Sequence, residues 1–335
     1  MNFSLHLTTG SAVFMSLFAA SLWGTWFISL KYLRDYPIQA FVMTLFTTVF
    51  VLAWGIGFIL DGPNLLKNIH DVSLATPSAI SVTLICGVLY VTGMSLTMTV
   101  LKTIGLSLSQ PIQSSINIIV GTLISGVIGG MPSDLSVLRV VAAVVFLLAA
   151  VIASVIAGNL RMQAQQAGQS QSTLSFSAKD MWRSLGLIAF ASAFVPAYSL
   201  AISYGLESVT HPEGLAVMPF MAMLASGAFI GAFLSNGVTL TIRKQWNCIW
   251  QAPFAIHRWG IMSGIFHFVG NTIHTFATAF LSSVVSWPLG VTSNLWTQIW
   301  GLIYGEFKGF PRKVYIALFS GFAFYLIGAF IMAMR

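Results

Sequence analysis

The chain has 335 residues, of which 57% are hydrophobic and only 7% are charged, and its formal net charge is +7. About a quarter of the residues in an average soluble domain are charged, so this composition excludes an ordinary water-soluble surface. Apolar runs of about 20 residues, the length that crosses a hydrocarbon core, recur along the sequence. They predict a polytopic α-helical membrane protein, because the strands of a membrane barrel would alternate in polarity instead.

The apolar runs predict ten transmembrane helices, which we place in chain order at residues 11–30, 38–60, 79–101, 111–130, 139–158, 184–206, 215–237, 261–282, 288–305 and 314–334. The first run lacks a basic leader and a small-residue cleavage site, so we expect a retained helix rather than a signal peptide. Cys86 is expected inside the third helix and Cys248 in a loop. We therefore expect no disulfide, no metal site and no cofactor.

The basic residues gather in alternate loops. Loops after odd-numbered helices hold 12 of the 15 Lys and Arg residues, and only Lys67, Arg139 and Arg335 fall on the other side. The positive-inside rule then places the odd-numbered loops in the cytoplasm and both termini outside, in a plasma (inner) membrane. Because orientation accounts for the basic excess, we expect no nucleic-acid partner.

A Gln- and Ser-rich stretch at 161–180 has no periodic apolar face and predicts a linker. It divides the chain into a first five-helix repeat at 1–158, a linker at 159–183 and a second repeat at 184–335. A second copy of a unit with an odd number of crossings must be inverted, which is a recurring transporter architecture.

Spacing between matched residues supports an inverted repeat. In each half 18 residues separate a glycine from a proline and six separate that proline from an asparagine, and the matched residues are Gly93, Pro111 and Asn117, and Gly270, Pro288 and Asn294. Coincidence is the alternative interpretation, because glycine is common in membrane helices.

Polar residues recur on single faces of the predicted helices. His267, Asn271 and His274 stand at i, i+4 and i+7. Since lipid tails offer no hydrogen bonds, these side chains must face protein or trapped water. They either bond helix to helix, at roughly 0.6 kcal/mol each, or line a polar cavity. We favour the first interpretation for Ser and Thr and the second for Asn, Gln and His.

A polar cavity of this kind predicts a solute-binding site. Carboxamides supply both donors and acceptors, and aromatic rings supply apolar faces on which a solute can pack. The predicted substrate-binding residues are Trp23, Trp26, Tyr90, Gln113, Asn117, Tyr198, His267, Asn271, His274, Asn294 and Gln298.

None of the eight acidic residues falls at the centre of a predicted helix. An embedded carboxylate is the usual proton carrier, so proton coupling would depend on another titratable group. His267 is the first candidate and Glu306, at a helix end, is the second.

Three stretches resemble the drug/metabolite transporter superfamily, in the branch of rhamnose/proton symporters, glucose uptake permeases and ureide permeases. "WGTWFISLK" at 23–31 resembles the first-helix signature of the ureide permeases, "GLSLSQPIQSSINIIVGTL" at 105–123 a stretch of the rhamnose symporter, and "GLIYGEFKGFPRKVY" at 301–315 the Gly-Glu motif and basic tail of the branch. The resemblance implies ten helices, a five-plus-five inverted repeat, a central site and alternating access.

These observations suggest an importer of a small neutral polar solute, with a rhamnose- or glucose-like monosaccharide as the first candidate. A ureide or nucleobase permease, with stacking on Trp23 or Trp26, is the alternative. A membrane-embedded enzyme is disfavoured, because His267 and His274 are about 10 Å apart along the helix axis, too far to chelate one ion.

Overall fold

In a computed structural model of the chain, described for residues 7–104, 106–167, 186–187, 190–194 and 196–334, the regular structure is helical. The segments are α1 (Thr9–Thr25), η1 (Trp26–Tyr32), α2 (Ile38–Asp61), α3 (Asn64–Ala75), α4 (Pro77–Ile104), α5 (Leu106–Val127), α6 (Val137–Ala167), α8 (Ala197–Leu200), η2 (Ala201–Gly205), α9 (Val217–Ile242), α10 (Asn247–Gln251), α11 (Phe254–Leu281), α12 (Ser283–Val291), α13 (Ser293–Ile303) and α14 (Arg312–Ala333). The described residues contain no β-strand, only two isolated bridges.

The predicted membrane-spanning character is confirmed in coarse form. Among the described residues, six segments are long and apolar enough to cross a membrane: Thr9–Tyr32, Ile38–Asp61, Pro77–Met98, Val137–Ala164, Val217–Ile242 and Arg312–Ala333. Elsewhere the helices are shorter, interrupted or more polar. The fold class is therefore an all-α membrane protein, with at least these six helices able to span.

Several predicted boundaries differ from the structure. The ninth predicted helix, 288–305, is two helices, α12 and α13, and α12 begins at Ser283. The linker predicted from 159 starts inside α6, which continues to Ala167, and residues 168–183 lie outside the described part of the chain. Helix α3 was not predicted, because it is too short and too polar to resemble a membrane span.

Prolines fix where several helices begin. Pro37, Pro63, Pro253 and Pro311 directly precede α2, α3, α11 and α14. The first turn of a helix has no use for the N–H that proline lacks, so these starts are favourable. Gly62, with φ of +55°, ends α2 in a conformation that glycine adopts without a steric cost.

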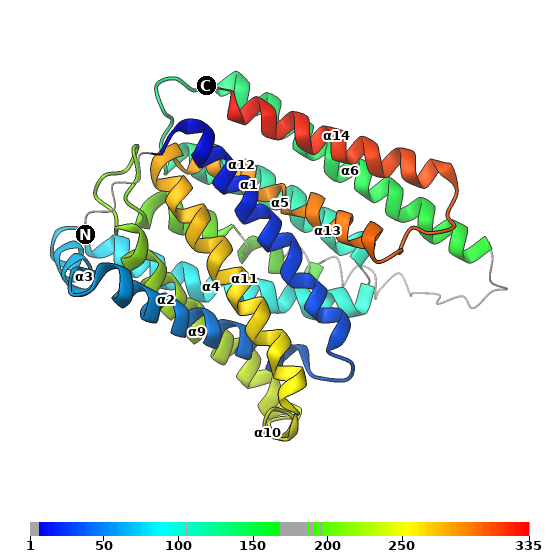
Figure 1. The fold of residues 1–335 in the computed structure, drawn as a ribbon, viewed down its shortest axis with the longest axis horizontal. Helices are drawn as coiled ribbons and strands as arrows, with labels where there is room; N and C mark the ends of the chain where they lie inside the picture. The colour runs from blue at the N-terminus through cyan, green and yellow to red at the C-terminus, as the bar shows by residue number, and fades with distance from the viewer. Residues whose placement is uncertain (1–6, 105, 168–185, 188–189, 195, 335) are drawn as a thin grey trace.

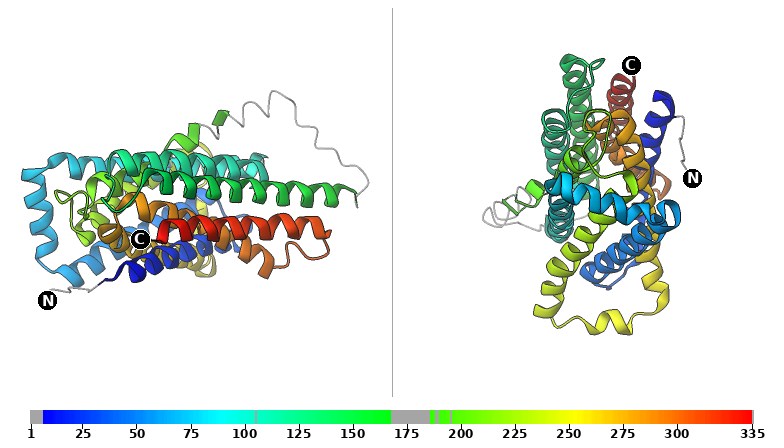
Figure 2. Two further views of the ribbon diagram at one scale, coloured as in Figure 1. Left: turned by 90° about the horizontal axis from the view of Figure 1, so that it is seen from above. Right: turned by 90° about the vertical axis from the view of Figure 1, so that its left-hand side faces the viewer.

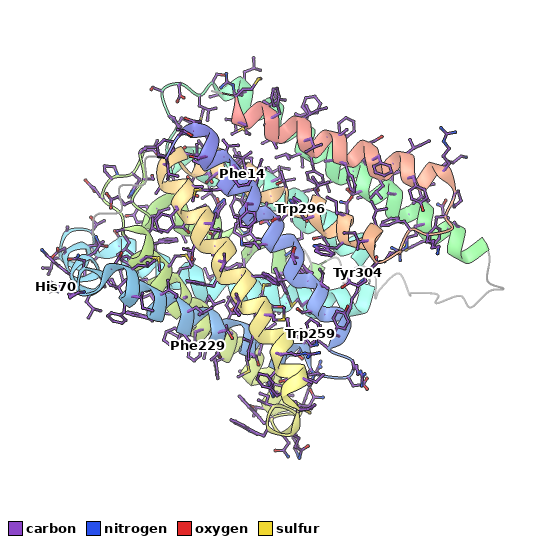
Figure 3. All side chains as sticks on the ribbon, in the orientation of Figure 1. Phe14, His70, Phe229, Trp259, Trp296 and Tyr304 are labelled. Carbon is purple, nitrogen blue, oxygen red and sulfur yellow. The ribbon has the colours of Figure 1, made fainter. Side chains whose placement is uncertain are left out.

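Four of the predicted odd-numbered loops lie at one end of the bundle. Lys31 of η1 and Arg161 of α6 both pair with Glu306, which lies in the loop after α13. Tyr32 stacks on Trp259 near the start of α11, with ring centroids 4.3 Å apart. Trp259 and Tyr304 lie toward this end, whereas His70 of α3 lies at the other (Figure 3).

The opposite end carries α3 and the loop between η2 and α9. The Ala216 amide of that loop donates to Asn68 of α3 at 3.1 Å. Arg139, near the start of α6, bonds to the carbonyl of Met334 near the C-terminus. Figure 1 shows the start of α1 and the end of α14 on this side of the molecule. These two helix ends thus share an end of the bundle with α3 and the loop between η2 and α9.

Helices α6 and α14 run side by side along one edge of the molecule, apart from the packed group of α1, α2, α4, α9 and α11 (Figures 1 and 2). Helices α5, α12 and α13 lie between them. Helices α5, α12 and α13 therefore contact both groups, α6 or α14 on one side and α1 or α4 on the other.

Glycines let α4 and α9 approach closely. A Cβ added at Gly227 would lie 2.1 Å from the Leu84 carbonyl oxygen, and one at Gly231 would lie 2.7 Å from the Val88 carbonyl oxygen. Gly87 of α4 faces the backbone of α9 in the same way. Small residues at such crossings are the usual means of packing helices in a membrane, where the hydrophobic effect does not drive association.

We expect Gly227→Ala to lower the free energy of unfolding by about 1–3 kcal/mol, the usual cost of overpacking. The added methyl group would displace α9 from the α4 backbone. The measurement is thermal unfolding of the purified protein in detergent. The control is Gly55→Ala in α2, where nothing lies within 4 Å of the new methyl group, and this change should not destabilise. Equal effects at the two positions would contradict the packing described.

Candidate functional site

A cluster of aromatic and histidine side chains occupies the middle of the bundle. It brings together residues of the two predicted repeats, namely Trp23 of α1, Trp26 of η1, Tyr90 of α4, Tyr198 of α8, His267, Asn271 and His274 of α11, and Trp287 of α12. All three polar residues of the α11 stripe are buried, with at most 5% of each exposed. Most of the predicted substrate-binding residues therefore meet in one place.

His267 leaves one ring nitrogen without a partner. Its Nε2 bonds to the hydroxyl of Tyr90, and the two rings are nearly parallel, 6.0 Å apart. The rings of Trp26 and Phe46 are steeply inclined to the imidazole of His267, with ring centroids 6.3 and 5.5 Å from its own. Nδ1 is buried and finds no hydrogen bond among the described residues. A buried unpaired polar atom costs roughly 1–3 kcal/mol, so Nδ1 is a natural contact for a solute or a water molecule.

His274, in contrast, bonds within the protein on both nitrogens. Its Nε2 lies 3.1 Å from the Ser286 carbonyl oxygen, which can only accept, so Nε2 carries the hydrogen. Nδ1 then accepts, and the hydroxyl of Tyr198 lies 3.4 Å away. His274 therefore orients Tyr198 and the start of α12, and has no free nitrogen to offer a solute.

Asn271 also bonds within the protein, to the side chain of Trp23. Its Oδ1 accepts from Trp23 Nε1 at 2.8 Å, and the Trp23 ring packs against His274 with centroids 4.8 Å apart. Gly270 and Gly290 make room for this indole, since a Cβ at either position would lie within 2.9 Å of it. The face of Trp23 is thereby fixed toward the cluster.

The two matched asparagines both lie where α5 meets α12 and α13. Asn294 donates to Ser114 at 3.1 Å, and Ser114 stands one turn before Asn117 on α5. Trp287 donates its indole N–H to the main-chain carbonyl of Asn117 at 3.0 Å. The side-chain Oδ1 of Asn117 is buried without a partner in the described part of the structure.

Gln298 and Gln113 lie to either side of this contact. Gln298 donates to Ser154 of α6 at 2.7 Å, and its Oε1 is buried and unpaired among the described residues. Gln113 donates to Thr97 of α4 at 3.3 Å. Both side chains connect helices across the bundle, and Gln298 retains a buried free acceptor.

Sequence reasoning missed Tyr325 and Phe46, both almost fully buried. Phe46 gives no signal, because it is one apolar residue among many in α2. Tyr325 does give a sequence signal, because it shares one helix face with two glycines. Gly321, Tyr325 and Gly328 stand at i, i+4 and i+7. Both glycines pack against α6. That face marks where α14 meets α6, near Ser154.

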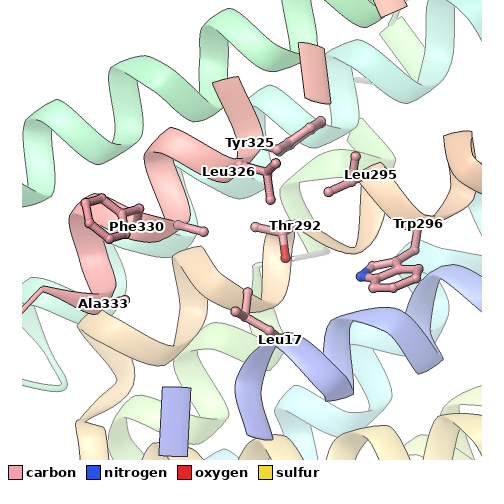
Figure 4. Close-up of a pocket in the computed structure, with 9 residues that line it drawn as sticks. Leu17, Thr292, Leu295, Trp296, Tyr325, Leu326, Phe330 and Ala333 are labelled. Atoms are coloured by element: carbon pink, nitrogen blue, oxygen red, sulfur yellow. The ribbon is translucent and has the colours of Figure 1, made fainter. Parts of the chain in front are cut away.

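An apolar cavity of about 300 Å³ lies outside this cluster, between α1, α13 and α14 (Figure 4). Its lining includes Leu326 and Phe330, which are 61% and 64% exposed. In a membrane such a surface contacts acyl chains. We therefore place the functional site at the buried aromatic cluster, where unpaired polar atoms are, and not in this cavity.

Glu306, the second candidate proton carrier, lies in an ion-pair cluster at one end of the bundle. Burial alone would raise its pKa, but hydrogen bonds and charges from Lys31 and Arg161 outweigh burial and hold the pKa below its ordinary value. Lys31 also lies over the Tyr304 ring, 4.2 Å from its centroid. A carboxylate held ionised in this way joins segments more readily than it carries a proton at neutral pH.

We expect Glu306→Gln to lower the apparent melting temperature at neutral pH. A carboxyl whose pKa is lowered on folding stabilises the folded state at pH values above its ordinary pKa of 4.5. This stabilisation is lost as the pH falls through the pKa of the folded state. The difference between wild type and variant should therefore shrink below about pH 4.5. Thermal unfolding across pH measures it.

The matched control is Glu213→Gln, a carboxylate in the loop between η2 and α9 that forms no ion pair in the described part of the chain. A wild-type minus Glu306→Gln difference that stays constant with pH would show that the ion pairs add nothing to stability.

No protein-family model and no curated protein matches this sequence. The chain is similar to a solved crystal structure described only as that of a protein, with a TM-score of 0.60, 14% sequence identity and 96% of each chain covered. Identity at this level carries the fold and nothing finer. The fold and the site together define an all-helical protein with several membrane-spanning helices, an architecture that fits a membrane transporter.

Proposed function

We propose that this protein imports a small neutral polar solute across the plasma membrane by alternating access. The observation that carries the proposal is the buried central cluster, together with Asn117, which Trp287 contacts. His267 Nδ1 and Asn117 Oδ1 lack partners among the described residues, although both lie within helices of a membrane protein. Buried polar atoms in lipid surroundings are expensive unless something bonds to them. A solute with hydrogen-bonding groups would satisfy them.

Glycine contacts support the inverted repeat that alternating access would use. Gly93 on α4 packs against Ala191 and Phe194, within the predicted sixth helix. Its match Gly270 on α11 packs against Ala19 and Trp23, within the first helix. The two contacts correspond under exchange of the halves. This is the relationship expected if α1 and the predicted sixth helix occupy equivalent places.

Helix pairing supports the same symmetry. Helix α4 packs on α9, and these are the third and seventh predicted helices. Helix α11 packs on α2, and these are the eighth and second. Exchange of the two repeats turns the first pair into the second. Helix α6 packs on α14, a pair that the exchange maps onto itself. Transporters built in this way bind solute near the pseudo-two-fold axis, between the repeats.

The chemistry of the cluster favours a neutral solute, because its described side chains are aromatic, carboxamide, hydroxyl or imidazole groups. A monosaccharide, with hydroxyl donors and acceptors and apolar ring faces, is the first candidate. A planar solute rich in N–H groups, such as a ureide or a nucleobase, is the second. Asn117 Oδ1 and Gln298 Oε1, which have no partner among the described residues, can accept from the N–H groups of the second candidate or from the hydroxyl groups of the first, and the indole faces suit both.

The test is uptake into vesicles reconstituted with the purified protein. Radiolabelled monosaccharides, ureides and nucleobases are offered in parallel, and vesicles without protein are the control. We expect saturable uptake of one of these classes only. Uptake of none of them, by protein shown to be folded, would contradict the proposal.

A catalytic role in the membrane has less support. It would need His267 and His274 to act as an acid/base or ligand pair, yet the first bonds to Tyr90 and the second to Ser286. Among the described residues no group of His, Cys, Asp or Glu side chains could hold a metal ion. We propose a transporter and not an enzyme.

We expect epitope tags at both termini to be accessible on intact cells, because the loops at the opposite end carry most of the basic residues. The measurement is antibody labelling before and after permeabilisation. A tag inserted at Gly309, in the loop that carries Glu306, should label only after permeabilisation. The reverse pattern would invert the orientation and leave the fold unchanged.

A further inference from the structure

Four buried serines from four segments meet near one end of the bundle. They are Ser125 of α5, Ser199 of α8, Ser203 of η2 and Ser283 of α12, each with at most 2% of its surface exposed. Ser203 bonds to Ser283 at 2.9 Å, and Ser125 bonds to Ser199 at 2.9 Å. Two main-chain carbonyls join them, since Ser199 bonds to Gly121 O at 2.7 Å and Ser283 approaches Ser125 O at 3.4 Å.

This serine cluster lies where three helices end. Ser125 stands two residues before the end of α5, Ser203 two before the end of η2, and Ser283 two after the end of α11. The C-terminal end of a helix carries a partial negative charge. The ends of α5 and η2 favour a positive charge at this group of oxygens, whereas at Ser283 the negative end of α11 meets the positive first turn of α12.

The backbone at the cluster is irregular. η2 is a π-helical turn, and Ser282 between α11 and α12 has φ of +75°, which is rare for any residue except glycine. Ser282 Oγ is fully buried and unpaired in the described structure, as is Thr122 Oγ1 beside Gly121. Strained backbone persists where the surrounding structure enforces it, often at functional sites.

The oxygens of the cluster are all neutral. Helices α5, α8, η2 and α12 contain no Asp or Glu. Divalent cations in proteins are commonly held by carboxylates, whose charge offsets that of the ion. Neutral hydroxyl and carbonyl oxygens near broken helices suit a monovalent cation, and transporters hold sodium ions with unwound carbonyls and helix C-terminal ends.

We propose that the serine cluster is a binding site for a monovalent cation, with Na⁺ as the ion. Ser125, Ser199, Ser203 and Ser283 supply hydroxyl oxygens, and the carbonyls of Gly121 and Ser125 supply the others. Ion binding would tie η2 and the start of α12 to α5. The role of this Na⁺ as the coupling ion of solute import rests on the function proposed above, whereas cation binding itself does not.

The experiment measures the melting temperature of the purified protein in detergent against NaCl, with choline chloride keeping ionic strength constant. Ligand binding to the folded state raises apparent stability by mass action. We expect a saturable rise with NaCl. In Ser203→Ala or Ser283→Ala, the concentration for half of the rise should increase by about tenfold, which corresponds to about 1.4 kcal/mol. Ser199→Ala serves if one of these variants does not fold.

The control is Ser16→Ala in α1, a buried serine with no hydrogen bond in the described structure, which should respond to NaCl as wild type does. An equal response to NaCl and choline chloride would overturn the proposal. So would variants of the cluster that respond as wild type does. Uptake into reconstituted vesicles separates the cation site from the transport function. Na⁺ binding without solute uptake would contradict only the transport function. Uptake by a protein that does not bind Na⁺ would contradict only the cation site.

Discussion

Replacing Asn117 with alanine should abolish solute uptake while expression and melting temperature stay close to those of the wild type. The reason is that Asn117 Oδ1 has no partner among the described residues, so the change breaks no bond made by that atom. The bond from Trp287 goes to the main chain of Asn117 and survives the substitution. Uptake into reconstituted vesicles, with melting temperature measured on the same preparation, checks the prediction.

Asn294→Ala should also abolish uptake, but with a measurable loss of stability. This change removes the hydrogen bond to Ser114, which is worth roughly 0.6 kcal/mol between membrane helices. Ser114→Ala breaks the same bond and leaves the asparagine, so it is the matched control. If Ser114→Ala stops uptake as completely as Asn294→Ala, the bond matters and the asparagine does not contact solute. Wild-type uptake by both asparagine variants would refute the central site.

His267→Gln should abolish accumulation against a gradient while exchange of solute across the membrane continues, provided that import is proton-coupled. An imidazole can take up a proton near neutral pH, whereas glutamine keeps a hydrogen-bonding end but cannot take up a proton. The described helices carry no carboxylate in the cluster, and Glu306 is engaged by Lys31 and Arg161 at the end of the bundle. Accumulation and exchange are measured in vesicles with an imposed pH gradient.

Tyr90→Phe is the matched control for His267, because it removes the hydroxyl that bonds to Nε2 and leaves the imidazole in place. We expect weaker solute binding with accumulation retained. If His267→Gln still accumulates solute, His267 is not the proton carrier. If His267→Gln loses both accumulation and exchange, its role is binding or packing.

The polar faces of single helices could be predicted from the sequence. His267, Asn271 and His274 share a face because residues at i, i+4 and i+7 do so in any α-helix, and lipid cannot satisfy them. The structure buries all three as expected. Their separate roles could not be predicted, since these depend on Tyr90, Trp23 and Ser286, which lie on other segments of the chain.

The sequence predicted the end of the eighth helix at residue 282, close to the end of α11 at Leu281, but not the start of α12 directly after it. The apolar runs predict a ninth helix that begins at Pro288. In the structure α12 begins at Ser283, and Pro288 lies inside it. Membrane helices tolerate an internal proline where neighbouring groups satisfy the freed carbonyl. Ser282, with its positive φ, has no sequence signature that would show how α11 and α12 are joined.

The serine cluster shows a limit of a different kind. Each serine alone is a common helix-packing residue, and the sequence favoured that interpretation for Ser199 on its helix. Only the fold brings Ser125, Ser203 and Ser283 together from distant segments. Pairwise spacing along one helix carries no information about such a meeting point.

The central claim is that solute binds at the buried cluster around His267 and Asn117. The most direct test is the shift in melting temperature of purified wild type and Asn117→Ala when monosaccharides, ureides and nucleobases are added in turn. Binding to the folded state raises the melting temperature by mass action. We expect that a solute of one class stabilises the wild type and that Asn117→Ala loses most of this stabilisation. Equal stabilisation of both proteins by the same solute would place the binding site elsewhere and contradict the account.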